Sequence, residues 1–116
     1  MPRALGEYLQ DILTNIERVE SYTAGTTEPE FSLDAMRYDA VERCIERVSE
    51  ASRGIPDDIK SRYPAVPWHD IAAIGNRIRH GYFAVHASII WQTATLDLPA
   101  LKQIILEIRA GHAPSP

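Results

Sequence analysis

The chain has 116 residues, the size of one domain that can bury a core without metals or disulfides. Hydrophobic residues make up 45% and charged residues 24%, with a net charge of -4, which argues against wholesale disorder and against a basic protein that coats nucleic acid. The single cysteine, Cys44, cannot form an internal disulfide, and there is neither a signal-peptide core nor an apolar run of about 20 residues, so we expect a cytoplasmic protein.

The first half of the chain places apolar residues at the three- and four-residue spacing of amphipathic helices. A first helix is predicted from Leu5 to about Gly25. The polar stretch that follows, residues 23–30 (TAGTTEPE), has no periodicity and is predicted to be a connector. Ser32 is the predicted N-cap of a second helix, which we expect to end at a left-handed glycine, Gly54.

The second half predicts further helices between proline-containing turns. Residues 56–64 (PDDIKSRYP) are interpreted as a connector that holds at most one helical turn. Pro67 suits the first position of a third helix. A fourth helical stretch is predicted over residues 85–96, and the helix is expected to restart at Asp97 and to close at Gly111.

No alternation at the period of a β-strand competes with these helices, so the predicted fold class is all-α. Amphipathic helices with short connectors most simply form an antiparallel bundle of four to five helices. We expect one domain over residues 1–110 and a flexible tail over residues 111–116.

Residues 74–83 (IGNRIRHGYF) place polar and charged side chains within an otherwise aliphatic helix. Asn76, Arg77 and His80 share one face at helical spacing. The imidazole of His80 can take the proton of a ribose 2′-hydroxyl or protonate the leaving oxygen, because its unperturbed pKa lies near neutrality. The guanidinium of Arg77 can hold two phosphate oxygens, and Asn76 can orient either group. The pattern suits metal-independent cleavage of a phosphodiester, but an ordinary solvated helix face more often has this pattern, and the spacing alone leaves both interpretations open.

Other reactive residues are predicted to be structural. Cys44 falls on the apolar face of the second helix and is expected to be buried. The four histidines lack the spacing of a ligand set, so we expect no metal site and no cofactor. Carboxylates and arginines that alternate on the second helix predict a salt-bridged solvent face, formed by Glu42, Arg43, Glu46, Arg47, Glu50 and Arg53.

Three stretches are similar to a known family: residues 39–56 (DAVERCIERVSEASRGIP), 66–76 (VPWHDIAAIGN) and 79–83 (RHGYF). Together they resemble the HepT-like branch of the HEPN superfamily, small helical toxins that act as ribonucleases. The resemblance extends from the first helix to about residue 108. It implies a HEPN-type bundle and a homodimer, in which His80 of both chains contributes to a composite site.

The family's motif is an arginine, four to six arbitrary residues, a histidine and, two positions later, a tyrosine. His80 and Tyr82 match the last two positions, and Asn76 matches the polar residue that commonly follows the arginine. The resemblance therefore implies catalysis at His80 and regulation at Tyr82.

Gly75 stands where the family has its arginine. Arg77 lies about 60° from His80 around a helix and is the first substitute, whereas Arg79 lies about 100° away and is an auxiliary phosphate contact. Glycine in a helix interior costs about 1 kcal/mol relative to alanine, so Gly75 indicates a close approach, for which we expect helix packing to be the cause. Such an approach would also suit the family's dimer.

The resemblance further implies a minimal nucleotidyltransferase antitoxin, MntA-like, which transfers AMP to the motif tyrosine, here Tyr82. The preferred interpretation is the toxin of a type VII-like (HepT/MntA-type) toxin-antitoxin system, an endoribonuclease silenced at Tyr82. The alternative is a catalytically silent HEPN-fold dimer that docks the nucleotidyltransferase, because Gly75 replaces the arginine. A helical adaptor unrelated to RNA is a third interpretation.

Overall fold

The structure, a computed structural model, describes residues 3–80 and 87–112. Every element in these two ranges is helical, and neither range contains a strand, which confirms the all-α fold class. The elements are α1 (Leu5–Thr23), α2 (Glu28–Leu33), α3 (Ala35–Ser52), α4 (Asp57–Lys60), α5 (Trp68–His80), α6 (Ala87–Gln92), the π-helical turn η1 (Thr93–Asp97) and α7 (Leu98–Gly111).

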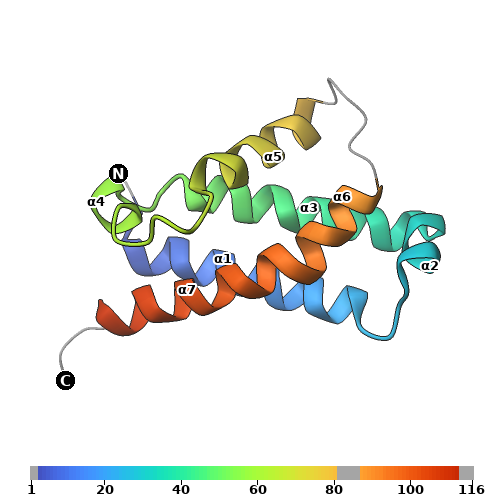
Figure 1. Cartoon of the computed structure of the whole chain (residues 1–116), viewed down its shortest axis with the longest axis horizontal. Helices are drawn as coiled ribbons and strands as arrows, with labels where there is room; N and C mark the ends of the chain where they lie inside the picture. The colour runs from blue at the N-terminus through green and yellow to red at the C-terminus, as the bar shows by residue number, and fades with distance from the viewer. Residues whose placement is uncertain (1–2, 81–86, 113–116) are drawn as a thin grey trace.

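The helices form a packed bundle that is 47 Å long and about as wide as it is deep, 30 × 28 Å (Figure 1). Helix α3 lies at its centre and packs against α1 on one side and α5 on the other (Figure 1). The continuous run of α6, η1 and α7 crosses over α1 and α3. Helix α5 has its main contact with α3, so its position depends chiefly on that interface.

The core consists of aliphatic side chains at the predicted helical spacing, together with one aromatic ring from α2. Its most deeply buried members are Leu9, Ile12, Ile16, Val19, Phe31, Val41, Ile45, Val48, Ile90, Ile105 and Ile108. Cys44 belongs to the same core and is 2% exposed, which confirms the prediction of a buried thiol. Burial of these side chains supplies the main favourable free energy of folding.

The connector predicted over residues 23–30 is wrong at its C-terminal end, because α2 begins inside it. The hydroxyl of Thr27 accepts the backbone N–H of Glu30 at 3.4 Å, and the Glu30 carboxylate accepts the backbone N–H of Thr27 at 3.2 Å. This reciprocal capping box satisfies two N–H groups at the start of the short helix. The predicted N-cap Ser32 lies within α2, and Asp34 caps α3 instead.

The predicted left-handed glycine at the end of α3 is also wrong. Gly25, which follows the end of α1 at Thr23, is the one residue with positive φ, 70°, among those that the structure describes. Gly54 is needed for space instead, because a Cβ there would lie 2.4 Å from atoms of the Tyr8 ring. The end of α3 at Ser52 agrees with the predicted boundary.

The helix restart predicted at Asp97 does not occur, because the backbone stays helical from α6 through η1 into α7. The Thr93 hydroxyl donates to the Ile89 carbonyl at 2.9 Å, and the Thr95 hydroxyl donates to the Trp91 carbonyl at 2.7 Å. Such bonds compete with the backbone hydrogen bonds of the helix. They occur here where the backbone hydrogen bonds change from the i→i+4 spacing of an α-helix to the i→i+5 spacing of a π-helix.

The remaining predicted boundaries agree with the structure wherever they fall within the described residues. The connector over 56–64 contains the single turn α4, and Pro67 directly precedes α5. Residues 85–86 of the predicted fourth stretch and residues 113–116 of the predicted tail lie outside the described ranges. Of the described helices, none combines the length and the apolar character needed to cross a bilayer.

Gly75 lies at the interface between α5 and α3. A Cβ built on it would be 2.2 Å from Ser49 Oγ and 2.4 Å from Ser49 Cβ, both far inside contact distance. The same Ser49 hydroxyl donates a hydrogen bond to the Ala72 carbonyl at 3.0 Å, which fixes it between the helices. The prediction of close helix packing is confirmed, and the approach is to α3 of the same chain.

Replacement of Gly75 by alanine should therefore destabilise the fold although alanine is the better helix former. We expect Gly75→Ala to lower the free energy of unfolding by about 1–2 kcal/mol, because Ser49 belongs to a packed helix and α5 must shift away. Urea denaturation followed by circular dichroism measures the change. Gly6→Ala is the matched control, because a Cβ at Gly6 meets nothing within 4 Å. That variant should gain up to about 1 kcal/mol, and an equal loss in both variants would contradict the packing argument.

Candidate functional site

The candidate residues cluster in the last turns of α5, where the structure describes Asn76, Arg77 and Arg79 with their side chains. His80 is the last residue of α5, but its side chain lies outside the described part, as does the whole of Tyr82. The described side chains divide between two sides of the helix. Arg77 lies beside a groove next to the α6–η1–α7 run, and Arg79 faces α3.

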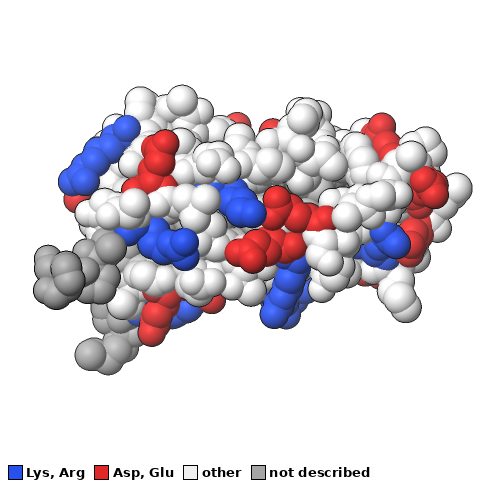
Figure 2. Space-filling view, turned by 90° about the horizontal axis from the view of Figure 1, so that it is seen from below, with Lys and Arg blue, Asp and Glu red and all other residues white. Residues whose placement is uncertain are grey.

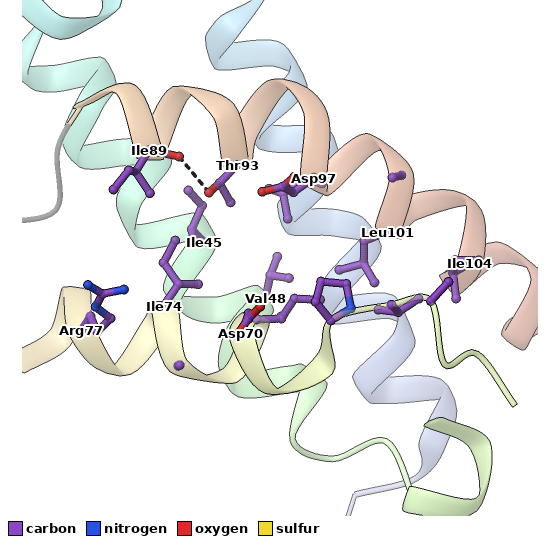
Figure 3. Close-up of a pocket in the computed structure, with 17 residues that line it drawn as sticks. Ile45, Val48, Asp70, Ile74, Arg77, Ile89, Thr93, Asp97, Leu101 and Ile104 are labelled. Carbon is purple, nitrogen blue, oxygen red and sulfur yellow. Dashed lines mark hydrogen bonds between the residues drawn. The ribbon is translucent and has the colours of Figure 1, made fainter. Parts of the chain in front are cut away.

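Arg77 borders a groove of about 660 Å³ between α5 and the α6–η1–α7 run. Figure 3 shows Arg77 and Ile74 projecting from α5 toward the helix that carries Ile89 and Thr93. The lining is mostly aliphatic and includes Ile45, Val48, Ile71, Ile74, Leu101 and Ile104. Asp70 and Asp97 also line the groove, so it contains two carboxylates and one guanidinium.

The guanidinium of Arg77 makes no hydrogen bond or ion pair with the residues that the structure describes. Its side chain is exposed, so its charge is solvated and available to an anion. A guanidinium in this state can form two parallel hydrogen bonds to a phosphate without first breaking an internal contact.

Arg79, in contrast, is engaged on the α3 side of the helix. Its Nη1 lies 3.6 Å from Glu50 Oε2, and its Nη2 donates to Asn76 Oδ1 at 3.0 Å. Glu50 Oε2 also lies 4.0 Å from Arg53 Nε, and Arg53 Nη2 donates to the Ala72 carbonyl at 3.1 Å. The amide of Asn76 thus orients Arg79, a contact that the sequence reasoning did not anticipate.

The helical geometry explains this division. Residues four apart share a helix face, so Arg79 lies one turn beyond Gly75 on the side that packs against α3. Arg77, two residues from each, projects to the opposite side. Arg77 is the closer of the two arginines to His80 in angle around the helix, and of the two it is also the one that lacks a partner among the described residues.

The salt-bridged face predicted for α3 forms in part. Arg43 Nη1 lies 3.3 Å from Glu46 Oε2, and Arg53 pairs with Glu50 as described above. Arg47 makes no ion pair with any described residue. Exposed pairs of this kind contribute little to stability, about 0–1 kcal/mol each. Their main effect is to neutralise some arginines of α3 and to leave others unpaired.

Charge is distributed evenly over the lower face of the bundle. Figure 2 shows that Lys and Arg atoms alternate with Asp and Glu atoms there and do not gather into a single broad patch. One such contact joins α7 to α1, between Lys102 Nζ and Glu20 Oε1 at 2.8 Å. Within the described residues no three His, Cys, Asp or Glu side chains gather in a group that suits a metal ion.

The comparison with known proteins identifies the family. A family model described as "Ribonuclease HepT-like" matches residues 12–108, most of the chain. The chain belongs to the HepT-like ribonuclease family. This confirms the resemblance found in the motif helix and in the second predicted helix. No solved structure was found to match the chain.

Three relatives illustrate the similarity. The chain is 36% identical over 102 residues to "Probable ribonuclease HepT" of Thermococcus cleftensis, a match that covers 88% of this chain and 93% of that protein. It is 33% identical over 102 residues to "Putative RNase MJ0125" of Methanocaldococcus jannaschii, covering 87% of each. It is 31% identical over 101 residues to "Putative RNase TTE0752" of Caldanaerobacter subterraneus, covering 87% of this chain and 90% of that one.

Removal of the carboxylate that holds Arg79 should release a second guanidinium for anions. We expect Glu50→Gln to bind tripolyphosphate about twofold to fivefold more tightly, in line with an exposed ion pair worth up to ~1 kcal/mol. Isothermal titration calorimetry at low salt measures the affinity.

Two controls separate this effect from a general change in charge. Glu107→Gln removes one exposed carboxylate from α7 and should change the affinity less. In an Arg79→Gln background, Glu50→Gln should lose most of its effect. Equal gains from Glu50→Gln with and without Arg79 would rule out the proposed competition.

Proposed function

We propose that this HepT-like protein is a metal-independent endoribonuclease and the toxin component of a type VII-like (HepT/MntA-type) toxin-antitoxin system. The observation that carries the proposal is that the guanidinium of Arg77, three residues before His80 on the motif helix, has no hydrogen bond or ion pair among the described residues. An imidazole and a cation at this spacing supply the two functions that in-line cleavage of RNA requires, proton transfer and neutralisation of phosphate charge.

In the proposed reaction His80, as general base, takes the proton from a ribose 2′-hydroxyl. The 2′-oxygen then attacks the adjacent phosphorus, and the bond from phosphorus to the 5′-oxygen of the next nucleotide breaks. A second imidazole or water donates the proton that the leaving oxygen needs, and the products are a 2′,3′-cyclic phosphate and a 5′-hydroxyl. Arg77 holds the phosphate oxygens, whose negative charge grows during the attack. Asn76 supports the site through its hydrogen bond to Arg79, the auxiliary phosphate contact.

The second imidazole is proposed to come from a second copy of the chain, so that the site is composite. The apolar groove beside Arg77 supports a contact between copies, because its aliphatic lining would be shielded from water there. Ile89 at the groove's edge is 42% exposed and would be covered by the same contact.

Regulation is proposed at Tyr82 by an MntA-like nucleotidyltransferase. The phenol oxygen attacks the α-phosphorus of ATP, pyrophosphate leaves, and the phenol proton passes to a base of the transferase or to water. The resulting AMP places a phosphate two residues from His80, where it would compete with RNA for the cationic groups and repel the RNA backbone.

A second candidate function is a binding module of the same fold that docks the nucleotidyltransferase and does not cleave RNA. The observation that favours it is the packing of Gly75. A Cβ at this position meets Ser49, so the position that carries arginine in the family motif has no room for a side chain here.

The two functions predict different results with RNA in EDTA. We expect the wild-type protein to cleave RNA, and we expect His80→Ala to lower the rate at least a hundredfold, because general acid–base catalysis contributes about 10²–10⁴. Arg77→Ala should lower it by a smaller factor. Gel analysis of a labelled RNA and detection of the 2′,3′-cyclic phosphate end measure the reaction.

His69→Ala is the matched control, since His69 is an exposed histidine of α5 about 16 Å away along the helix axis. It should cleave at the wild-type rate. RNA left equally intact by the wild type, His80→Ala and Arg77→Ala would rule out the endoribonuclease and leave the binding module.

For Tyr82, we expect co-expression with an adjacent nucleotidyltransferase to raise the mass of the protein by AMP units and to suppress cleavage. Intact-mass spectrometry measures the addition. Tyr82→Phe should abolish it, because phenylalanine lacks the accepting oxygen, whereas Tyr63→Phe should not. An unchanged wild-type mass beside an active transferase would refute this mode of regulation.

A further inference from the structure

A second groove lies between α1 and α3, on a side of the bundle that the proposed reaction does not use. Its volume is about 650 Å³, within the range of small-ligand sites, and its lining is polar to a greater extent than that of the groove beside Arg77. Its polar lining includes Asn15 and Arg18 from α1, and Arg47 and Glu50 from α3.

The charges in this groove divide into those that are neutralised internally and those that are not. Arg3 pairs with Asp11, Nη2 to Oδ2 at 2.7 Å, and with Glu7 at 3.3 Å. Glu50 lies near the guanidinium groups of Arg79 and Arg53. Two further cations of the groove, Arg18 and Arg47, make no hydrogen bond or ion pair with described residues.

The charges of Arg18 and Arg47 both act on the Cys44 thiol, although the two arginines come from different helices. Burial raises the pKa of the Cys44 thiol, and the guanidinium groups of Arg47 and Arg18 both act in the opposite direction. Arg18 and Arg47 also line the same groove from neighbouring helices, so an anion bound in the groove would face both guanidinium groups. Their mutual repulsion makes an anion between them favourable.

One residue that lines the groove, Asn15, has an unsatisfied buried acceptor. Asn15 is 6% exposed, its Nδ2 donates to the Asp11 carbonyl at 2.8 Å, and its Oδ1 is buried without a hydrogen-bond partner among the described residues. A buried acceptor of this kind requires an explanation, since most are satisfied. A ligand with an N–H group as well as a negative charge would complement both the amide and the arginines.

We propose that the groove between α1 and α3 binds one nucleotide of a single-stranded RNA, with its phosphate between Arg18 and Arg47 and a base N–H directed to Asn15. The inference rests on the proposed ribonuclease function, since RNA is the substrate proposed there. Glu50 lines the groove and lies 3.6 Å from Arg79 Nη1, so the groove adjoins the Arg79 side of the motif helix.

The test is a binding measurement that does not depend on cleavage. A fluorescein-labelled, fully 2′-O-methylated oligonucleotide lacks the nucleophile, and its affinity is followed by fluorescence anisotropy over a range of KCl concentrations. We expect the double variant Arg18→Gln/Arg47→Gln to bind about tenfold more weakly, because it loses charge-assisted hydrogen bonds to phosphate. The slope of log affinity against log salt should fall by about 0.7, the value for one phosphate of a single strand.

Arg62→Gln/Arg109→Gln is the matched control, because it removes two exposed arginines that line neither groove. It should retain most of the wild-type affinity and salt slope. Equal weakening in both doubles, or no weakening in the first, would overturn the inference. A change of oligomeric state in the first double alone, seen by light scattering, would assign the groove to a contact between copies and would also overturn it.

The outcome is separable from that of the proposed function. Weaker binding by the groove double together with a wild type that leaves RNA intact would support the groove and refute the ribonuclease. Cleavage by the wild type together with unchanged binding by the groove double would support the ribonuclease and refute the groove.

Discussion

The arrangement of the motif helix depends on the contact between Gly75 of α5 and Ser49 of α3. No other described helix packs against α5 to a comparable extent, so this interface sets its distance and rotation. The Ala72 carbonyl accepts from the Ser49 hydroxyl and from the Arg53 guanidinium, so two side chains from the end of α3 hold this turn of α5. A side chain at Gly75 would separate the helices, and both hydrogen bonds would lengthen. The absence of a side chain at one position therefore determines where every later residue of α5 points.

This rotation assigns different roles to the two arginines beside His80. Arg79 projects to the Gly75 side, where Glu50 and Asn76 hold it in place. Arg77 projects to the opposite groove, where it has no described partner and needs only to lose water before it binds an anion. The guanidinium that the family motif places at position 75 cannot occupy this packed interface. In this chain the nearest arginines lie instead one turn beyond it, where Arg79 is paired, and on the opposite side of the helix, where Arg77 has no described partner.

The sequence was sufficient to predict the long helices and the core, because a stripe of aliphatic residues such as that of α1 has one plausible period and one face to bury. It was not sufficient for α2 and η1. Helix α2 is too short for periodicity, and its capping box between Thr27 and Glu30 was the available signal. The π turn depends on how Thr93 and Thr95 bond to their own helix, which no periodic pattern records. Helical spacing predicted that Arg77 shares a face with Asn76, whereas Arg77 borders the groove with Ile74, and Asn76 accepts a hydrogen bond from Arg79. This division, like the contact between Arg79 and Glu50 across 29 positions, needed coordinates.

The chain is acidic, yet it has cations for the RNA substrate proposed above. Five of its ten arginines pair with a carboxylate three or four residues away, as in Arg43 with Glu46, and a phosphate would have to displace that partner. Among the described residues, Arg18 and Arg47 remain unpaired where α1 and α3 meet, because the carboxylates of that groove, Asp11 and Glu50, pair with other arginines. Affinity for a strand then depends on the number of such positions and not on net charge, because each phosphate held by an unpaired cation releases counterions. The helix interfaces thus set both the fold and the places where a polyanion can bind.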